Sequence, residues 1–164
     1  MRFSYIDLFA GCGGLSLGLE KAGFSLVLAV ELSRMAAETF YHNFIKRLES
    51  AKAWEAYLTL DIEEQSRQKL VVDSVQSVLG HQYLMSKLSG LNMDLVAGGR
   101  PCQGFSLAGR RIPEDKRNQL AWQFLDFVER VEPKAVIMEN VPGISQDFVK
   151  HKKESPLKDL MNAL

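Results

Sequence analysis

The sequence has few cysteines, no long apolar run and no excess of charge of either sign, and each absence excludes a class of protein. Cys12 and Cys102 are too few for a disulfide framework, and no second cysteine pair is present to complete a zinc site. No apolar run approaches the roughly 18 residues of a membrane-spanning helix. Asp7 interrupts the N-terminal residues where a signal peptide needs continuous apolar residues. We therefore expect a cytoplasmic, non-exported protein with reduced cysteines, no membrane partner and no metal.

The charge balance also limits the kinds of partner. Lys and Arg number 20 and Asp and Glu number 20 among 164 residues, so the formal net charge is zero. This excludes a uniformly basic coat for nucleic acid but leaves room for a local basic patch. Hydrophobic residues make up 46% and charged residues 24%, as in ordinary globular domains. The chain is therefore expected to form one domain with a sizeable core.

Short apolar segments alternate with helical periodicity along the chain. Strands are expected at 3–9, 25–30, 94–97 and 135–138, with a strand end at 58–62. Helices are expected at 14–22, after Ser33, at 70–88 with a break at Gly80, at 120–131 and after Ser155. This alternation predicts an α/β fold with a parallel sheet.

The glycine-rich segment from Gly11 to Gly14 follows the first strand and opens a helix. Unhindered backbone amides at a positive helix end bind anionic or carboxylate-bearing ligands. Glu31 ends the next strand, 20 residues after Gly11, where a carboxylate can accept hydrogen bonds from both ribose hydroxyls. Ser16 stands where the dinucleotide fingerprint has its third glycine, so a nicotinamide cofactor fits less well than S-adenosylmethionine. The alternative is a tight turn that binds no ligand.

Asp61 is a further candidate at this edge of the sheet. If it ends a third strand, its carboxylate could accept a hydrogen bond from an adenine amino group. The alternative is a surface acid or a helix cap, which is an ordinary use of aspartate.

Cys102 and Glu139 each follow an expected buried strand, and both should lie at the carboxyl edge of the sheet, where such sheets bind ligands. Between Arg100 and Arg117, five basic residues stand against two acidic ones. Nearby cations increase the thiolate fraction of a cysteine, and the same patch could lie against a phosphate backbone. Burial would let the Glu139 carboxyl hold or donate a proton. The alternatives are an inert buried cysteine and a capping or ion-paired acid.

Four segments occur in one order, and their combination strongly resembles the DNA cytosine-5 methyltransferase family. They are Asp-Leu-Phe-Ala-Gly-Cys-Gly-Gly at 7–14, Glu31, Pro-Cys-Gln-Gly-Phe-Ser at 101–106 and Glu-Asn-Val at 139–141. The resemblance implies a doubly wound, mostly parallel, Rossmann-like methyltransferase fold that uses S-adenosyl-L-methionine. It also implies that Cys102 adds covalently to carbon 6 of a flipped cytosine, that Glu139 contacts the same ring, and that carbon 5 takes the methyl group.

The resemblance assigns further residues by their positions in these segments. The cofactor residues it implies are Phe9, Ala10, Gly11, Cys12, Gly13, Gly14, Leu15, Glu31, Leu32, Asp61 and Ile62. The residues it implies around the flipped base are Arg100, Pro101, Gln103, Ser106 and Arg117. The implied partner is double-stranded DNA, and a bacterial protein of this kind would be associated with the nucleoid.

Two departures from the family pattern are visible. The first is the length of the stretch 46–92. The second is that the catalytic-arginine segment, the target-recognition domain and the late cofactor segment of the family do not occur, and the sequence after Gly143 contains no arginine. The last expected helix is apolar up to Leu164 with no strand after it, unless that helix simply closes the fold. We therefore expect 1–164 to be a partial catalytic domain, incomplete at its C-terminal side and inactive in methylation alone.

Several readings remain open for such a partial domain. It could be a portion of an enzyme or one subunit of a split methyltransferase, which would need a complementary subunit. It could be a non-catalytic remnant that binds S-adenosylmethionine, or its substrate could be RNA. An unfinished sheet edge could also lead to self-association.

Overall fold

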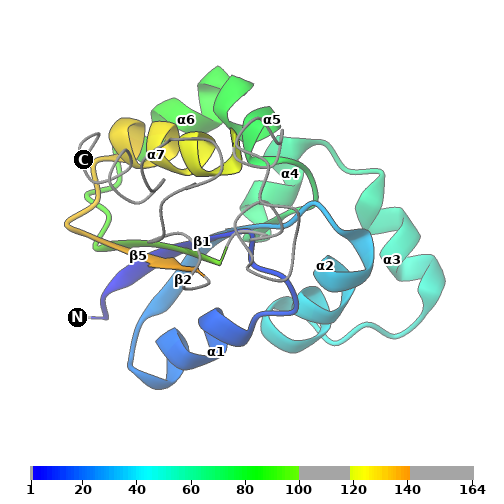
Figure 1. Ribbon diagram of the computed structural model, residues 1–164. Coiled ribbons are helices and arrows are strands. Elements are labelled where there is room, and N and C mark those ends of the chain that lie inside the picture. Colours follow the sequence, from blue (N-terminus) through cyan, green and yellow to red (C-terminus); the bar gives the residue numbers. More distant parts are fainter. Residues whose placement is uncertain (1, 100–118, 141–164) are drawn as a thin grey trace, which may run out of the picture.

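The computed structural model describes residues 2–99 and 119–140, and its centre is a parallel sheet of five strands in the order β3-β2-β1-β4-β5 (Figure 1). The strands are β1 Ser4–Leu8, β2 Ser25–Val30, β3 Leu70–Val71, β4 Leu95–Gly99 and β5 Ala135–Glu139. Every neighbouring pair is parallel. The predicted α/β fold with a parallel sheet is therefore confirmed.

Helices cover both faces of the sheet, so each central strand is buried on two sides. On one face lie α1 Gly14–Lys21, α2 Arg34–Phe40, the π-helical turn η1 Tyr41–Ile45 and α3 Ala51–Leu58. On the other face lie α5 Val75–Gly80, α6 Gln82–Ser89 and α7 Gln119–Val131, and α4 Ile62–Arg67 precedes β3. Side chains of a strand alternate between the two faces: in β1, Tyr5 packs into the first core and Ile6 into the second.

The strand order places a switch point between β1 and β4. The chain runs outward from β1 through β2 to β3, and then returns to the other side of β1 for β4 and β5. In doubly wound sheets ligands bind outside the carboxyl ends of the strands at such a point. A ligand site is therefore expected at the residues that follow Leu8 and Gly99.

The structure corrects the reading of residues 58–62, which do not form the end of a strand. Leu58 ends α3, and Asp61 caps α4 in a reciprocal arrangement with Glu64. The Asp61 carboxylate accepts from the Glu64 amide at 2.8 Å, and the Glu64 carboxylate accepts from the Asp61 amide at 3.3 Å. This capping box fixes a helix start. The third strand is instead the two-residue β3, inside the stretch expected to be helical.

The last strand also differs from expectation, because β5 is not buried. Its residues alternate between exposed and half-buried, and Ile137 is 44% exposed. Within the described residues β4 is its only strand partner. The expected helix after Ser155 lies outside the described residues.

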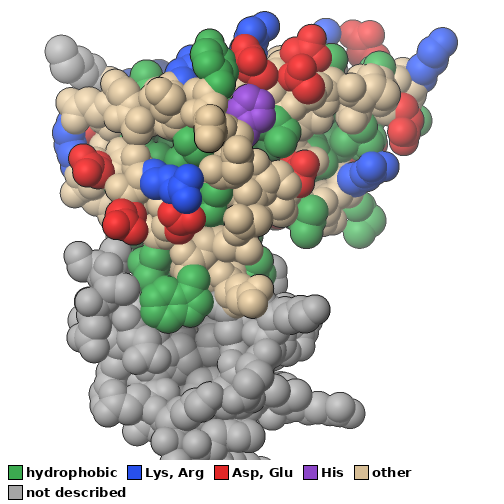
Figure 2. Space-filling view, turned by 90° about the horizontal axis from the view of Figure 1, so that it is seen from above, with side chains coloured by type: hydrophobic (Ala, Val, Ile, Leu, Met, Phe, Trp, Pro, Cys, Tyr) green, Lys and Arg blue, Asp and Glu red, His purple; other side chains and the backbone are tan. Residues whose placement is uncertain are grey.

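One face of the described part carries charges of both signs. Figure 2 shows acidic and basic side chains interspersed over the face that carries α5, α6 and α7. Among the helices of residues 2–99 and 119–140, none has the length and apolar character needed to cross a membrane.

Candidate functional site

The turn after β1 bends sharply because three of its residues adopt left-handed backbone conformations. The φ angles are 58° at Phe9, 57° at Gly11 and 92° at Gly13. At Gly13 a side chain has no room, since a Cβ atom would lie 2.2 Å from Cε2 of Phe44. The turn leads directly into α1, whose first turn has neither an acidic residue nor a side-chain cap. The helix itself therefore supplies no acidic group or side-chain cap for its first amides, which lie at the edge of the sheet.

A buried hydrogen bond fixes this helix to the strand before it. Ser16 lies in the first turn of α1 and donates from Oγ to Oδ2 of Asp7 on β1, at 2.6 Å. Both residues are fully buried. Burial raises the pKa of Asp7 to about 6, with the hydrogen bond from Ser16 acting against this rise. The serine in place of a third glycine thus anchors the turn to the sheet.

Glu31 links the end of β2 to the glycine turn. Its Oε2 accepts from the Gly11 amide at 2.8 Å, and its Oε1 accepts from the Ser33 amide at 2.6 Å. Ser33 in turn caps α2, as expected. The carboxylate is thereby held at the carboxyl edge of the sheet, and each oxygen keeps a lone pair for a ligand.

A cavity of about 250 Å³ lies at this edge, and residues from five segments line it. The lining residues are Phe9, Gly11, Val30, Glu31, Leu32, Asp73, Ser74, Val75, Gly99, Leu120 and Gln123. Four of the residues assigned to the cofactor from the sequence are among them: Phe9, Gly11, Glu31 and Leu32. The other seven are not: Ala10, Cys12, Gly13, Gly14, Leu15, Asp61 and Ile62. Cys12 is exposed, and Leu15, in the first turn of α1, is partly buried against the core.

Asp73, and not Asp61, is the acid that follows the third strand of the sheet. It follows β3 closely, and its Oδ1 accepts from the Ser74 amide at 2.6 Å and from Ser77 Oγ at 2.7 Å. Asp61 is committed to the cap of α4, and Ile62 packs against the core. The prediction of Asp61 as a strand-end acid is therefore wrong. The sequence did contain a signal for Asp73. It follows Val71 and Val72, just as Glu31 at the end of β2 follows Val30.

Glu139 lies beside the end of β4, as its position at a strand end predicts. Gly99 and Glu139 are partners in the parallel register, and a Cβ atom on Gly99 would lie 3.3 Å from Oε2 of Glu139. Gly99 lines the cavity, and Glu139 itself is not among the lining residues. The expectation that Glu139 is buried is wrong, because the β5 edge leaves it exposed. Cys102 follows three residues after Gly99 and lies outside the described residues, as do Arg100, Pro101, Gln103, Ser106 and Arg117.

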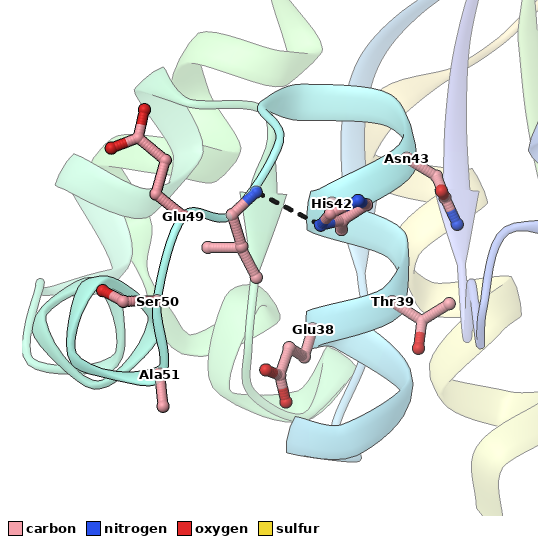
Figure 3. Close-up of a pocket in the computed structure, with 8 residues that line it drawn as sticks. Glu38, Thr39, His42, Asn43, Glu49, Ser50 and Ala51 are labelled. Carbon is pink, nitrogen blue, oxygen red and sulfur yellow. Dashed lines mark hydrogen bonds between the residues drawn. The ribbon is translucent and has the colours of Figure 1, made fainter.

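A second, larger cavity of about 470 Å³ opens between α2, η1 and the start of α3. Figure 3 shows Glu38, Thr39, His42 and Asn43 on one side of it and Glu49, Ser50 and Ala51 on the other. The Leu48 amide donates to Nδ1 of His42 at 3.2 Å. In the part of the chain that the structure describes, no group of three or more His, Cys, Asp or Glu side chains could hold a metal ion.

Comparison with known proteins agrees with this geometry. The family model for C-5 cytosine-specific DNA methylase matches residues 3–164. The Type II methyltransferase M.XorII of Xanthomonas oryzae is 38% identical over 143 residues, covering 85% of this chain and 28% of that protein. M.HgiGI of Herpetosiphon aurantiacus is 38% identical over 136 residues, covering 83% of this chain and 88% of that protein.

A solved structure extends the likeness to the fold. A protein described as a DNA modification methyltransferase encoded within a prophage of E. coli superimposes with a TM-score of 0.67 and is 32% identical. The match covers 99% of this chain and 37% of that chain. The chain thus spans about a third or less of the length of several relatives, including M.XorII.

The cavity residues also suit the methyl donor of these enzymes, S-adenosyl-L-methionine. Among the lining residues, Glu31 offers a carboxylate for a ribose diol. The start of α1 follows the lining residue Gly11 but does not itself line the cavity, and its amides suit a carboxylate. Phe9, Leu32, Val75 and Leu120 supply apolar walls for a purine. From the parallel sheet, the cavity at its switch point and the match over residues 3–164, we conclude that the chain belongs to the C-5 cytosine-specific DNA methylase family.

Proposed function

We propose that this chain is the cofactor-binding and nucleophile-bearing part of a DNA cytosine-5 methyltransferase. The observation that carries the proposal is the cavity at the switch point of the sheet. One carboxylate, Glu31, is tied to the glycine turn on its wall, and a second, Glu139, lies against Gly99 at the end of β4. The two acids lie at the same edge of the sheet in different surroundings. One can therefore bind a ligand while the other takes part in proton transfer.

In this proposal the cavity holds the adenosyl part of S-adenosyl-L-methionine. Glu31 accepts hydrogen bonds from the two ribose hydroxyls with the lone pairs that its backbone donors leave free. Phe9 and Leu120 enclose the purine ring, and the first amides of α1 attract the carboxylate of the methionine tail. The bound cofactor supplies an electrophilic methyl group.

The proposed chemistry begins with a cytosine flipped out of the duplex, at a cost of a few kcal/mol. The Cys102 thiolate forms a bond to carbon 6, and the ring electrons move toward carbon 5. Glu139 holds a proton at ring nitrogen 3 and contacts the exocyclic amine, which stabilises the charge that builds up during addition. The bound cofactor would supply the methyl group to carbon 5 as its bond to the sulfonium sulfur breaks, and it would leave as S-adenosylhomocysteine. Carbon 5 would then lose its proton to solvent, and the bond from carbon 6 to Cys102 would break to release the thiolate and the methylated base.

We further propose that the chain needs a complementary polypeptide to read double-stranded DNA and to act on it. The chain spans only 28% of M.XorII. We therefore expect the isolated chain to bind the cofactor weakly and to transfer no measurable methyl group. Rapid methylation by purified 1–164 would contradict this expectation.

The cofactor role is tested by titrating the chain with S-adenosylhomocysteine and following its amide resonances by nuclear magnetic resonance, which detects weak binding. Glu31→Gln should weaken binding about tenfold or more, because charged hydrogen bonds to the ligand and the tie to Gly11 are both impaired. Glu55→Gln, an exposed change on α3 away from the cavity, is the matched control. Equal affinity of Glu31→Gln and wild type would refute the assigned role.

The nucleophile is tested in the enzyme reconstituted with its complementary polypeptide. DNA that carries 5-fluorocytosine cannot lose the substituent at carbon 5, so the covalent adduct should accumulate with wild type and be absent with Cys102→Ser. Binding of the cofactor without any adduct or methylation in the reconstituted enzyme would favour the alternative, a non-catalytic S-adenosylmethionine-binding remnant.

A further inference from the structure

A further cavity, of about 290 Å³, is bordered by η1, α3 and the loop that joins them. Nearly all of its lining residues belong to the stretch 46–92, whose length departs from the family pattern. Among the described residues, it shares no lining residue with the cavity at the switch point. The function proposed above therefore leaves this cavity without a role.

Two buried tyrosines form the inner wall of this cavity. The ring centroids of Tyr41 and Tyr57 lie 4.5 Å apart, and Trp54 stacks on Tyr57 at 5.4 Å. The hydroxyl of Tyr41 donates to Oε1 of Gln68 at 3.2 Å, and the hydroxyl of Tyr57 donates to the carbonyl oxygen of Leu70. Because both hydroxyl protons are used inside the protein, the fixed rings offer a ligand mainly apolar surface.

The rest of the wall is aliphatic, and charged side chains stand at its rim. The aliphatic residues are Leu48, Ala53, Ala56 and Leu60. Lys46 and Arg47 are exposed at the rim, and within residues 2–99 and 119–140 neither forms an ion pair or a side-chain hydrogen bond. Glu49 is the one acid among the lining residues. The rim thus has an excess of one positive charge.

The end of η1 brings the two cations to this rim. The Lys46 amide donates to the carbonyl oxygen of Tyr41 at 2.9 Å, which is the wide turn of a π-helix. Lys46 itself has an extended backbone with φ of −157°, so the helix ends there and the chain continues along the cavity. Turns of this kind are rare and occur frequently at functional sites, which supports a role in binding.

We propose that this cavity binds a small planar aromatic anion, such as an aryl carboxylate, with its ring against Tyr41 and Tyr57 and its charge at Lys46 and Arg47. The inference does not depend on the function proposed above. A concave site with apolar walls and a few polar groups is typical of small organic ligands. Aromatic side chains pack well against an aromatic ring, and the excess of positive charge favours an anion over a cation.

The test titrates the full chain with two ligands of one shape. 2-Naphthoate carries the negative charge, and 2-naphthamide is its neutral counterpart. Amide resonances followed by nuclear magnetic resonance give both the affinity and the place of binding. The double variant Lys46→Gln/Arg47→Gln removes the cations of the rim, and Ala56→Leu fills the cavity from α3. Lys52→Gln, an exposed change on α3 outside the cavity, is the matched control.

We expect wild type to bind 2-naphthoate with a Kd of about 0.1–1 mM, the range for a ligand of this size. It should bind 2-naphthamide about three- to tenfold more weakly, because the neutral ligand lacks the charged contacts. The double variant should bind the two ligands alike, Ala56→Leu should weaken both by about tenfold or more, and Lys52→Gln should match wild type. The replaced residues are exposed, so the thermal midpoints should match that of wild type.

The location of the shifted resonances decides which cavity is occupied. The largest shifts should occur at Ala53, Ala56 and Tyr57; shifts centred on Gly11 and Val75 would place the ligand at the switch point and refute the inference. Equal affinity of wild type for the two ligands, or an unchanged preference in the double variant, would refute the role of the cations. Full affinity in Ala56→Leu, or no binding of either ligand by wild type at millimolar concentration, would refute the site itself.

Discussion

The buried carboxyl of Asp7 should make the stability of the protein fall as the pH rises. Asp7 is fully buried on β1; Ser16 donates to its Oδ2, and its Oδ1 has no hydrogen-bond partner among residues 2–99 and 119–140. Burial, and to a smaller extent the charge of Glu31, raises the pKa of Asp7 from 3.8 to about 6. The folded protein therefore binds this proton more tightly than the unfolded chain, so folding is favoured below pH 4 and loses that advantage between about pH 4 and pH 6.

The magnitude follows from the pKa values. A rise from 3.8 to about 6 corresponds to about 3 kcal/mol of unfolding free energy, at about 1.4 kcal/mol for each pH unit. Asp7→Asn keeps an oxygen that can accept from Ser16 and cannot ionise. The variant should therefore gain on wild type as the pH rises, by up to about 3 kcal/mol above pH 6, and the gain should be absent below pH 4.

Urea denaturation of both proteins at intervals from pH 4 to pH 8 measures this difference. Ser16→Ala provides a second test, because the hydrogen bond from Ser16 lowers the pKa of Asp7, and its loss should move the pH window upward. A difference between Asp7→Asn and wild type that stays constant across this range, or that shrinks as the pH rises, would refute the reasoning.

Two further predictions concern the frame around the site. Gly13→Ala should lower the free energy of unfolding by about 1–3 kcal/mol, because φ is 92° there and the new Cβ would meet the ring of Phe44. Gly18→Ala, in open space within α1, should raise the free energy of unfolding by up to about 1 kcal/mol. Urea denaturation of both variants shows whether the two changes have these opposite signs. Hydrogen bonds from Lys134 and then from Ser4 lower the pKa of Asp94 to about 2, so its contribution to stability is present above pH 4 and is lost as the pH falls toward 2. Asp94→Asn should lower the thermal midpoint at pH 7 and should match wild type near pH 2; a deficit that persists at pH 2 would contradict this account.

The parts of the fold that could be predicted from the sequence are those in which local pattern and tertiary context agree. The strands β1, β2 and β4 are short, mostly apolar segments of five or six residues that end in a turn or an acid, and each was expected. The strand β3 has only two residues, which is too few to show a pattern in the sequence. Asp61, which caps α4, is an acid that follows apolar residues, and this local sequence resembles the end of a strand. Asp73 was missed for this reason.

Burial at a sheet edge could not be read from local sequence either. The run from Ala135 to Met138 is as apolar as that of a central strand, but exposure depends on which elements pack against β5, and these come from elsewhere in the chain. Gln123, which lines the cavity from α7, was likewise not identified, because a partly buried polar residue beside an apolar helical stripe can be assigned to a cavity only once the surrounding packing is known.

The two backbone amides on Glu31 have a consequence for how any affinity at this site is measured. The carboxylate is already oriented in the ligand-free protein by Gly11 and Ser33, so a ligand that meets it loses little conformational entropy in ordering this side chain. The same two bonds join the loop after β1 to the loop after β2. Replacement of Glu31 therefore loosens both loops in addition to removing one contact, and the affinity lost in such a variant is an upper limit on what that contact contributes.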